Sequence, residues 1–181
     1  IVIQNNGRKH RRMVGLIRFI LFFFVFLSYG QEHILIGDSQ TTYLSKNSIK
    51  IKRIPELSKG GIGVPYLINM VSSYPKSTNV KSVSICIGVN DRYKDRGVNE
   101  LVKIVKNKFP NAKLFVIQGS WGWGGVSKMN QTNLDLYYKH FVDLGCSLIT
   151  PPIGYGDPHR DKKTYETIIK KIESLINKNN E

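Results

Sequence analysis

The feature that most constrains the fold is a regular alternation, from residue 31 onward, of short β-branched runs with longer amphipathic stretches. Runs of this kind are typical of buried strands, whereas apolar residues spaced three and four apart indicate helices that cover a sheet. The alternation therefore predicts βαβ units, and the economical arrangement is a three-layer α/β/α sandwich with a five-stranded parallel sheet. We expect strands near residues 33–37, 48–53, 82–87, 113–118 and 146–149, and helices near residues 40–46, 64–73, 97–108, 130–144 and 161–177.

The chain is strongly basic, with 27 Lys and Arg against 13 Asp and Glu among 181 residues and a formal net charge of +14. The first thirty residues contain five of the basic residues and no acidic one, which leaves a formal charge of +9 on residues 31–181. Such a surface favours encounters with anionic polymers. The lysines are dispersed, however, and are not interleaved with aromatic residues as in proteins that bind single-stranded nucleic acid. We therefore expect solvated strand and helix faces and no specific nucleic-acid partner.

The first thirty residues form a separate segment. Its charge-free apolar core, from Phe19 to Leu27, is far shorter than the roughly 20 residues that cross a bilayer. It matches the apolar region of a signal peptide, with Arg18 before it and small Ser28 and Gly30 at a cleavage site after Gly30. This predicts a leader over residues 1–30, a domain over residues 31–181, and secretion or release into an extracytoplasmic space. The alternative is an uncleaved membrane anchor, with the bilayer thinned around it.

Three short loops contain the residues that could take part in catalysis. Gly37-Asp38-Ser39 and Gly88-Val89-Asn90-Asp91 each follow an expected strand, and Gly156-Asp157-Pro158-His159 precedes the last expected helix. Open parallel sheets gather their sites at the carboxyl ends of the strands. A serine, a histidine base and an amide donor together form a minimal hydrolase site, because the serine needs a base and the developing oxyanion needs fixed donors.

These loops, in this order, resemble the motifs of the SGNH hydrolase superfamily, the GDSL-type esterases. The resemblance extends over residues 33–177 and implies a flavodoxin-like fold. It assigns the nucleophile to Ser39, although Gln40 stands where the family usually has leucine. It also implies an oxyanion hole built from the Ser39 N–H, a glycine N–H of the second motif and the side-chain amide of Asn90. For the glycine, Gly61 is the preferred match and Gly63 is the alternative.

The resemblance further assigns the catalytic base to His159. The family usually places an aspartate three residues before this histidine, but here that residue is Gly156, and Asp157 stands two residues before. Two interpretations follow. Either Asp157 orients the imidazole, or a backbone carbonyl does so in its place.

A glycine-rich loop after the fourth expected strand contains Trp121 and Trp123. Exposed indoles commonly stack on sugar rings or cover an acyl group, so we expect these residues to bind substrate. The alternative is that one of them closes the edge of the sandwich. Neither a Cys-x-x-Cys nor a His-x-x-x-His spacing occurs. We therefore expect a site without metal or cofactor, and we expect Cys86 and Cys146 to be buried small apolar residues.

The resemblance implies a serine esterase that works through an acyl-enzyme. Together with the expected export and the paired tryptophans, it leads us to expect an ester substrate such as an O-acetyl group on a carbohydrate or surface polymer. Two alternatives from other classes remain. One is an inactive binding module on the same fold, and the other is a basic protein that binds an anionic polymer without chemistry.

Overall fold

The computed structural model describes residues 31–120, 131–152, 157 and 159–177, and this part of the chain contains five strands and five helices. The strands are β1 (His33–Gly37), β2 (Ile51–Ser58), β3 (Ser82–Cys86), β4 (Lys113–Ile117) and β5 (Ser147–Ile149). The helices are α2 (Gln40–Ser45), α3 (Val64–Ser73), α4 (Val98–Lys108), α5 (Gln131–Asp143) and α6 (Lys162–Asn177).

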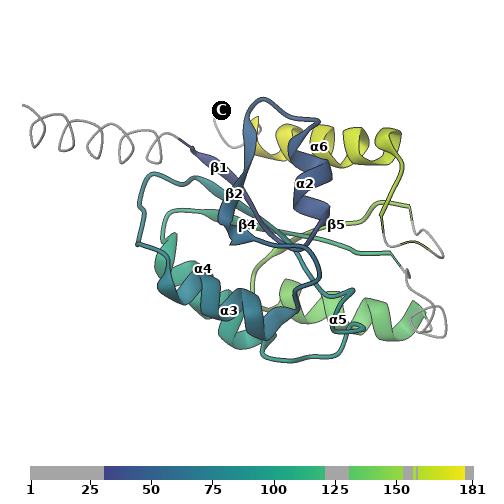
Figure 1. The fold of residues 1–181 in the computed structure, drawn as a ribbon, viewed down its shortest axis with the longest axis horizontal. Coiled ribbons are helices and arrows are strands. Elements are labelled where there is room, and N and C mark those ends of the chain that lie inside the picture. Colours follow the sequence, from purple (N-terminus) through teal and green to yellow (C-terminus); the bar gives the residue numbers. More distant parts are fainter. Residues whose placement is uncertain (1–30, 121–130, 153–156, 158, 178–181) are drawn as a thin grey trace, which may run out of the picture. The chain divides into compact units, whose positions relative to one another are not determined.

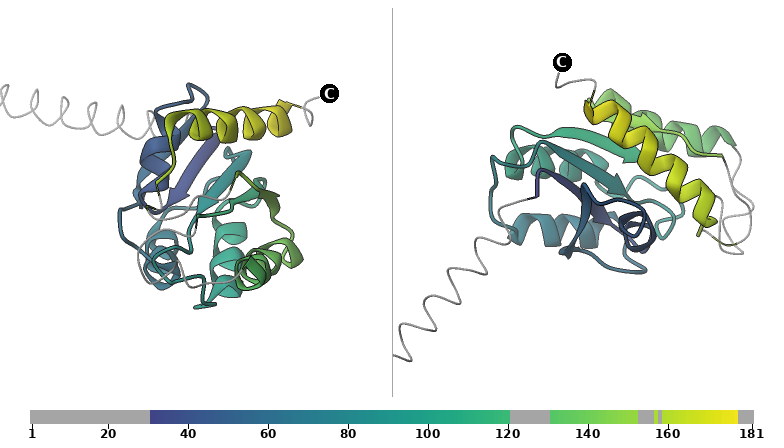
Figure 2. Two further views of the ribbon diagram at one scale, coloured as in Figure 1. Left: turned by 90° about the vertical axis from the view of Figure 1, so that its right-hand side faces the viewer. Right: turned by 90° about the horizontal axis from the view of Figure 1, so that it is seen from above.

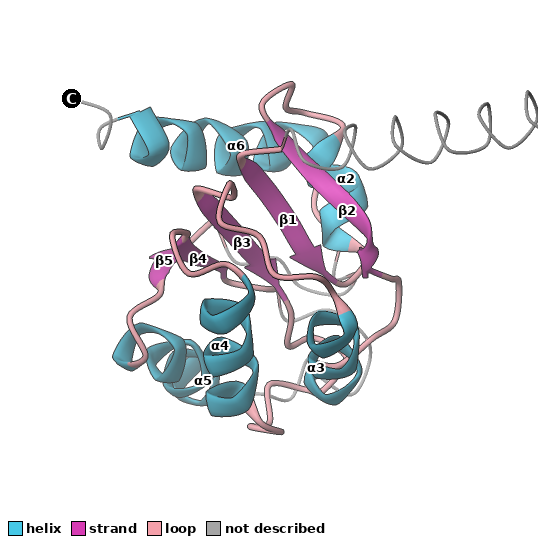
Figure 3. Ribbon diagram, turned by 90° about the vertical axis from the view of Figure 1, so that its left-hand side faces the viewer, coloured by secondary structure: helices cyan, strands magenta, loops and turns pink. Residues whose placement is uncertain are grey.

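The five strands form one sheet in the order β2-β1-β3-β4-β5, and every pair is parallel. Helices α2 and α6 cover one face of the sheet, and α3, α4 and α5 cover the other (Figures 1 and 3). Figure 2 shows the same division from two further directions, with α6 lying over the face that α2 also covers. The predicted three-layer α/β/α sandwich is therefore confirmed.

The two faces of the sheet have separate apolar cores, because residues of a strand point alternately to opposite sides. In β1, Ile34 and Ile36 pack toward α3, α4 and α5, whereas Leu35 packs toward α2 and α6. The two cysteines are buried free thiols, and they lie in opposite cores. Both act as small apolar packing residues.

The second strand differs from its predicted range. We expect a strand near residues 48–53, but β2 runs from Ile51 to Ser58 and passes through Pro55. A proline lacks the N–H that an interior strand needs, so it normally ends a strand. Here β2 is an edge strand, and its pairing with β1 shifts register between Leu35 and Gly37. The irregular register and the free edge accommodate Pro55.

The predicted leader, residues 1–30, lies outside the described residues, so its cleavage and the location of the protein stay predictions. Within the described ranges, no helix has the length and apolar character needed to cross a membrane.

The strand order determines where the site lies. The connection from β1 leads to β2 on one side, while β3 lies on the other side of β1. In sheets of this order, ligands bind at the carboxyl ends of the two strands that flank this reversal. Ser39 follows β1 and Asn90 follows β3, so both lie at this point.

A close approach between β1 and β3 occurs at the same point. Gly37 has a φ of +128°, and a Cβ on it would lie 1.9 Å from the carbonyl oxygen of Cys86. The next residue, Asp38, donates its N–H to that same oxygen over 2.9 Å. Only glycine permits the backbone to turn this sharply against the neighbouring strand.

Gly37→Ala should therefore lower the free energy of unfolding by about 3 kcal/mol or more, since a clash adds to the backbone strain. Gly145→Ala is the matched control. Gly145 also has a positive φ, but the nearest atom to its added Cβ would be 3.5 Å away, so we expect a loss of about 1 kcal/mol. Urea unfolding of both variants measures the difference. Equal losses would show that the contact with Cys86 is unimportant.

Candidate active site

The hydroxyl of Ser39 faces a base. Ser39 stands immediately before α2, where a serine commonly caps the helix, yet its side chain makes no capping hydrogen bond. Asp38 takes that role, with its carboxylate accepting the Gln40 N–H over 3.0 Å. The Ser39 Oγ lies 2.9 Å from Nε2 of His159, which is 120 residues further along the chain. The structure thus brings together the predicted nucleophile and the predicted base.

The other ring nitrogen of His159 faces Asp157. Its Nδ1 lies 2.8 Å from Oδ1 of Asp157, and the same oxygen accepts the backbone N–H of His159 over 2.7 Å. These hydrogen bonds lower the pKa of Asp157, the backbone one most strongly. An ionised Asp157 accepts the Nδ1–H, and the unprotonated Nε2 can then accept the proton of Ser39. A spacing of two residues therefore suffices to align serine, histidine and aspartate.

This aspartate is unusually open to solvent. Its side chain is 69% exposed, whereas that of His159 is 25% exposed. Water weakens the electrostatic effect of an exposed carboxylate on its neighbour. We therefore expect Asp157 to fix the orientation of the imidazole more than to stabilise its charge.

The loop between β2 and α3 lies beside Ser39. A Cβ built on Gly60 would lie 3.8 Å from the Cβ of Ser39, and Gly61 follows with a φ of +76°. The N–H of Gly61, the predicted oxyanion donor, belongs to the peptide that joins these two glycines. Gly63 has a different environment, because a Cβ there would lie 2.2 Å from a carboxylate oxygen of Asp91. These contacts place the Gly60–Gly61 peptide, rather than Gly63, next to Ser39.

The loop after β3 holds the loop between β2 and α3 in place; we call this second loop, residues 59–63, the glycine loop. The side-chain amide of Asn90 donates to the carbonyl of Ile62 over 2.9 Å, and its second N–H is available to a substrate oxygen. The buried carboxylate of Asp91 accepts the Val64 N–H over 2.6 Å at the start of α3. The neighbouring motif residues thus have separate functions: Asn90 reaches the glycine loop and Asp91 secures the helix behind it.

Asp38 is a buried acid directly before Ser39 in the chain. Only 2% of it is exposed, and burial raises its pKa to about 7. Its backbone hydrogen bond from Gln40 opposes this increase only in part. The sequence motifs indicate no separate role for Asp38, because an aspartate after a strand is typical of a turn or a helix cap.

The two remaining predicted site residues lie outside the described residues, and the other described histidines make contacts of their own away from Ser39. Trp121 and Trp123 are outside them, so their predicted contact with substrate stays a prediction. His33 contacts Ser82 over 2.9 Å where β1 begins, at the opposite end of the strand from Ser39, and His140 pairs with Asp95 over 2.9 Å. In the described ranges, no three His, Cys, Asp or Glu side chains gather in a metal-binding arrangement.

Comparison with solved structures identifies the fold. A proposed acylhydrolase from Bacteroides fragilis superposes with a TM-score of 0.63 at 15% identity, over 82% of this chain and 88% of that one. A GDSL-like lipase from Bacteroides thetaiotaomicron gives 0.59 at 10% identity, over 82% and 88%. The catalytic domain of peptidoglycan O-acetyltransferase A from Streptococcus pneumoniae gives 0.51 at 16% identity, over 82% and 91%.

No protein-family model and no curated protein sequence matches the chain. The structural likeness nevertheless establishes that the chain has the fold of the SGNH hydrolases.

Asp157→Asn should lower kcat by about 100-fold. In buried triads the same change costs about 10,000-fold, because it stabilises the wrong tautomer, and we expect solvent to reduce the effect here. Asp161→Asn is the matched control, since the Asp161 carboxylate accepts hydrogen bonds from Thr164 instead of the imidazole. Steady-state kinetics on a short-chain aryl ester compares the two variants. A loss below tenfold for Asp157→Asn would reduce the site to a Ser39–His159 dyad.

Asp38→Asn should remove a pH-dependent loss of stability. Unfolded Asp38 releases its proton near pH 4, whereas folded Asp38 keeps it until about pH 7. The stability of the wild type therefore falls as the pH rises through this window, by up to roughly 4 kcal/mol. Unfolding experiments at pH 4.5 and pH 8 measure the difference between variant and wild type. The free energy of unfolding of Asp38→Asn, relative to that of the wild type, should increase from pH 4.5 to pH 8. If the relative value does not change with pH, folded Asp38 does not have a raised pKa.

Proposed function

We propose that this chain is a serine esterase that hydrolyses its substrate through an acyl-enzyme. The observation that supports it best is the continuous alignment of Ser39 Oγ, His159 Nε2 and Nδ1, and Asp157 Oδ1, with contacts of 2.9 and 2.8 Å. A serine turned away from the histidine would instead have favoured an inactive binding module.

The residues divide the reaction into two halves. The Ser39 Oγ attacks the ester carbonyl carbon while His159 Nε2 accepts its proton, and the carbonyl oxygen becomes an oxyanion. The N–H groups of Ser39 and Gly61 and the amide of Asn90 stabilise this charge. As the tetrahedral intermediate collapses, His159 returns the proton to the leaving alcohol. Water then attacks the acyl-enzyme by the same route and regenerates Ser39.

We further propose that the substrate is an O-acetyl ester on a carbohydrate or another surface polymer. The likeness to a domain that acts in peptidoglycan O-acetylation supports this class, as does the predicted export of the chain. A groove of about 360 Å³ also borders the loop that follows Asn90 and extends to α5. It is lined by residues including Arg92, Lys94 and Tyr137, and it offers space for part of a polymer beside the loop that carries Asn90.

Labelling with a fluorophosphonate tests the nucleophile. The wild type should be labelled on Ser39, and Ser39→Ala should lose both labelling and hydrolysis of aryl acetates. Ser45→Ala is the control, because the Ser45 hydroxyl bonds only to the carbonyl of Thr42 within α2 and should not affect the reaction. Wild-type protein that neither reacts nor hydrolyses, or an active Ser39→Ala variant, would rule out the proposed function.

Asn90→Ala should lower kcat by about 100- to 1000-fold with little change in fold, because the amide acts mainly on charge that develops in the transition state. Asn111→Ala is a suitable control, since its amide also donates to a backbone carbonyl, that of Thr78. Kinetics and circular dichroism of both variants provide the comparison. Retained activity in folded Asn90→Ala would exclude Asn90 from the oxyanion hole.

A further inference from the structure

We propose that Gln40 and Tyr165 are positioning residues that hold His159 in line with Ser39. The proposal rests on the proposed esterase function. It concerns a bridge of two hydrogen bonds between the residue that follows the nucleophile and the residue that follows the base.

The bridge passes through one phenol oxygen. Tyr165 Oη donates to Oε1 of Gln40 over 2.6 Å and accepts the backbone N–H of Arg160 over 3.0 Å. Gln40 is the first residue of α2 and directly follows Ser39, and Arg160 directly follows His159. The two halves of the site, 120 residues apart in sequence, are thereby joined a second time, behind the contact between Ser39 and His159.

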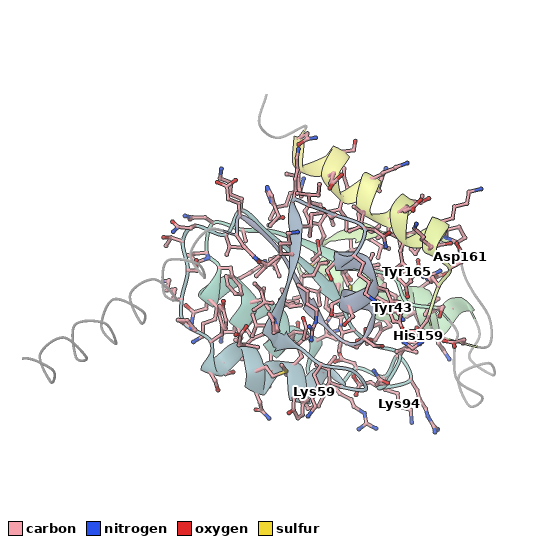
Figure 4. All side chains as sticks on the ribbon, turned by 45° about the horizontal axis from the view of Figure 1, so that its top comes forward. Tyr43, Lys59, Lys94, His159, Asp161 and Tyr165 are labelled. Carbon is pink, nitrogen blue, oxygen red and sulfur yellow. The ribbon has the colours of Figure 1, made fainter. Side chains whose placement is uncertain are left out.

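The centre of this bridge is fixed within the fold. Tyr165 lies in the first turn of α6 and is 2% exposed, and its ring stacks on that of Tyr43 with 5.5 Å between centroids and an angle of 7°. The ring of Tyr43 in turn lies 4.9 Å from that of His159. Figure 4 shows these three labelled side chains gathered between α2 and the start of α6. Burial raises the pKa of Tyr165 to about 12, so its hydroxyl remains a donor at every pH at which an ester can be assayed.

The residues on either side of His159, which we call the histidine segment, need such an anchor. Asp157 is mostly exposed, so the contact before His159 is open to water. After it, the guanidinium of Arg160 donates to the carbonyls of Gln118 and Pro152, which follow β4 and β5. These bonds hold the Arg160 side chain, whereas the hydrogen bond to Tyr165 holds the Arg160 backbone N–H, in the residue directly after His159.

Gln40 is essential to this arrangement because it supplies the acceptor. The resembling family usually has leucine at this place, and a leucine side chain has no oxygen for the phenol. The glutamine that replaces the usual leucine at position 40 thus makes a specific contact in this chain, the hydrogen bond with Tyr165.

Proton transfer from Ser39 to His159 depends on alignment to within about 1 Å, whereas binding of a small ester does not. Loss of the bridge should therefore lower kcat and leave KM nearly unchanged. Because both residues act through the same hydrogen bond, their effects should not add.

The experiment is a double-mutant cycle of Tyr165→Phe and Gln40→Met, which keep side-chain size but remove the donor and the acceptor. We expect Tyr165→Phe to lower kcat about 10- to 100-fold and Gln40→Met about tenfold, with KM within twofold. The double variant should be no slower than Tyr165→Phe alone. Thr167→Val is the control on α6, because its hydroxyl bonds only to the Lys163 carbonyl of the same helix, and it should stay within twofold of the wild type.

Spectra of protein with ¹⁵N-labelled histidine provide a readout that does not need activity. The wild type should show distinct signals for a protonated Nδ1 and an unprotonated Nε2 of His159, and these should average in both variants as the ring is released. Unchanged kcat and unchanged spectra in folded variants would overturn the positioning role and leave the esterase proposal intact. Additive losses, or losses in KM alone, would also overturn it. Wild-type protein without esterase activity would instead refute the proposed function, and the spectra would still decide whether the bridge holds His159.

Discussion

The hydrogen bond from the Asp38 N–H to the Cys86 carbonyl determines the geometry on which the rest of the site depends. It closes β1 against β3 at the reversal of strand order, and it requires glycine at position 37. Once this contact is made, the residues after the two strands leave the sheet side by side. Ser39 and Asn90 therefore both follow neighbouring strands, and the backbone geometry at this point places the predicted nucleophile.

The loops that follow the strands are held by side-chain hydrogen bonds to backbone groups as well as by buried apolar residues such as Val89 and Tyr93. On one side of Ser39, Asn90 and Asp91 bind the glycine loop and the start of α3. On the other side, Tyr165 accepts the backbone N–H of Arg160, and the Arg160 guanidinium donates to the carbonyl of Gln118. Each bond of this kind contributes only about 1 kcal/mol to stability, yet together they set the alignment on which the proposed chemistry depends.

The sequence predicted the fold well because local patterns determine it: α3 occupies the expected residues, and the other helices begin and end within two residues of their predicted bounds. The second strand was misjudged because the effect of Pro55 depends on whether a strand lies at an edge, which a local pattern does not reveal. For a similar reason, the sequence did not decide whether Asp157 or a backbone carbonyl orients His159, since the answer depends on how the backbone folds between the two residues. Tyr165 stands at a helically spaced apolar position of the last helix, and its ring is buried, but only the position of its hydroxyl shows the bridge.

The irregular edge strand also bears on how copies of the protein behave toward one another. A free strand edge is a template for pairing with another chain, and long, flat edges invite aggregation. At one margin of this sheet, Pro55 removes a donor from β2 and the register shift bends the strand, while at the other margin β5 is only three residues long. Neither margin offers a continuous row of backbone donors and acceptors. The same proline that obscures β2 in the sequence thus helps to keep the sheet at five strands when many copies are present.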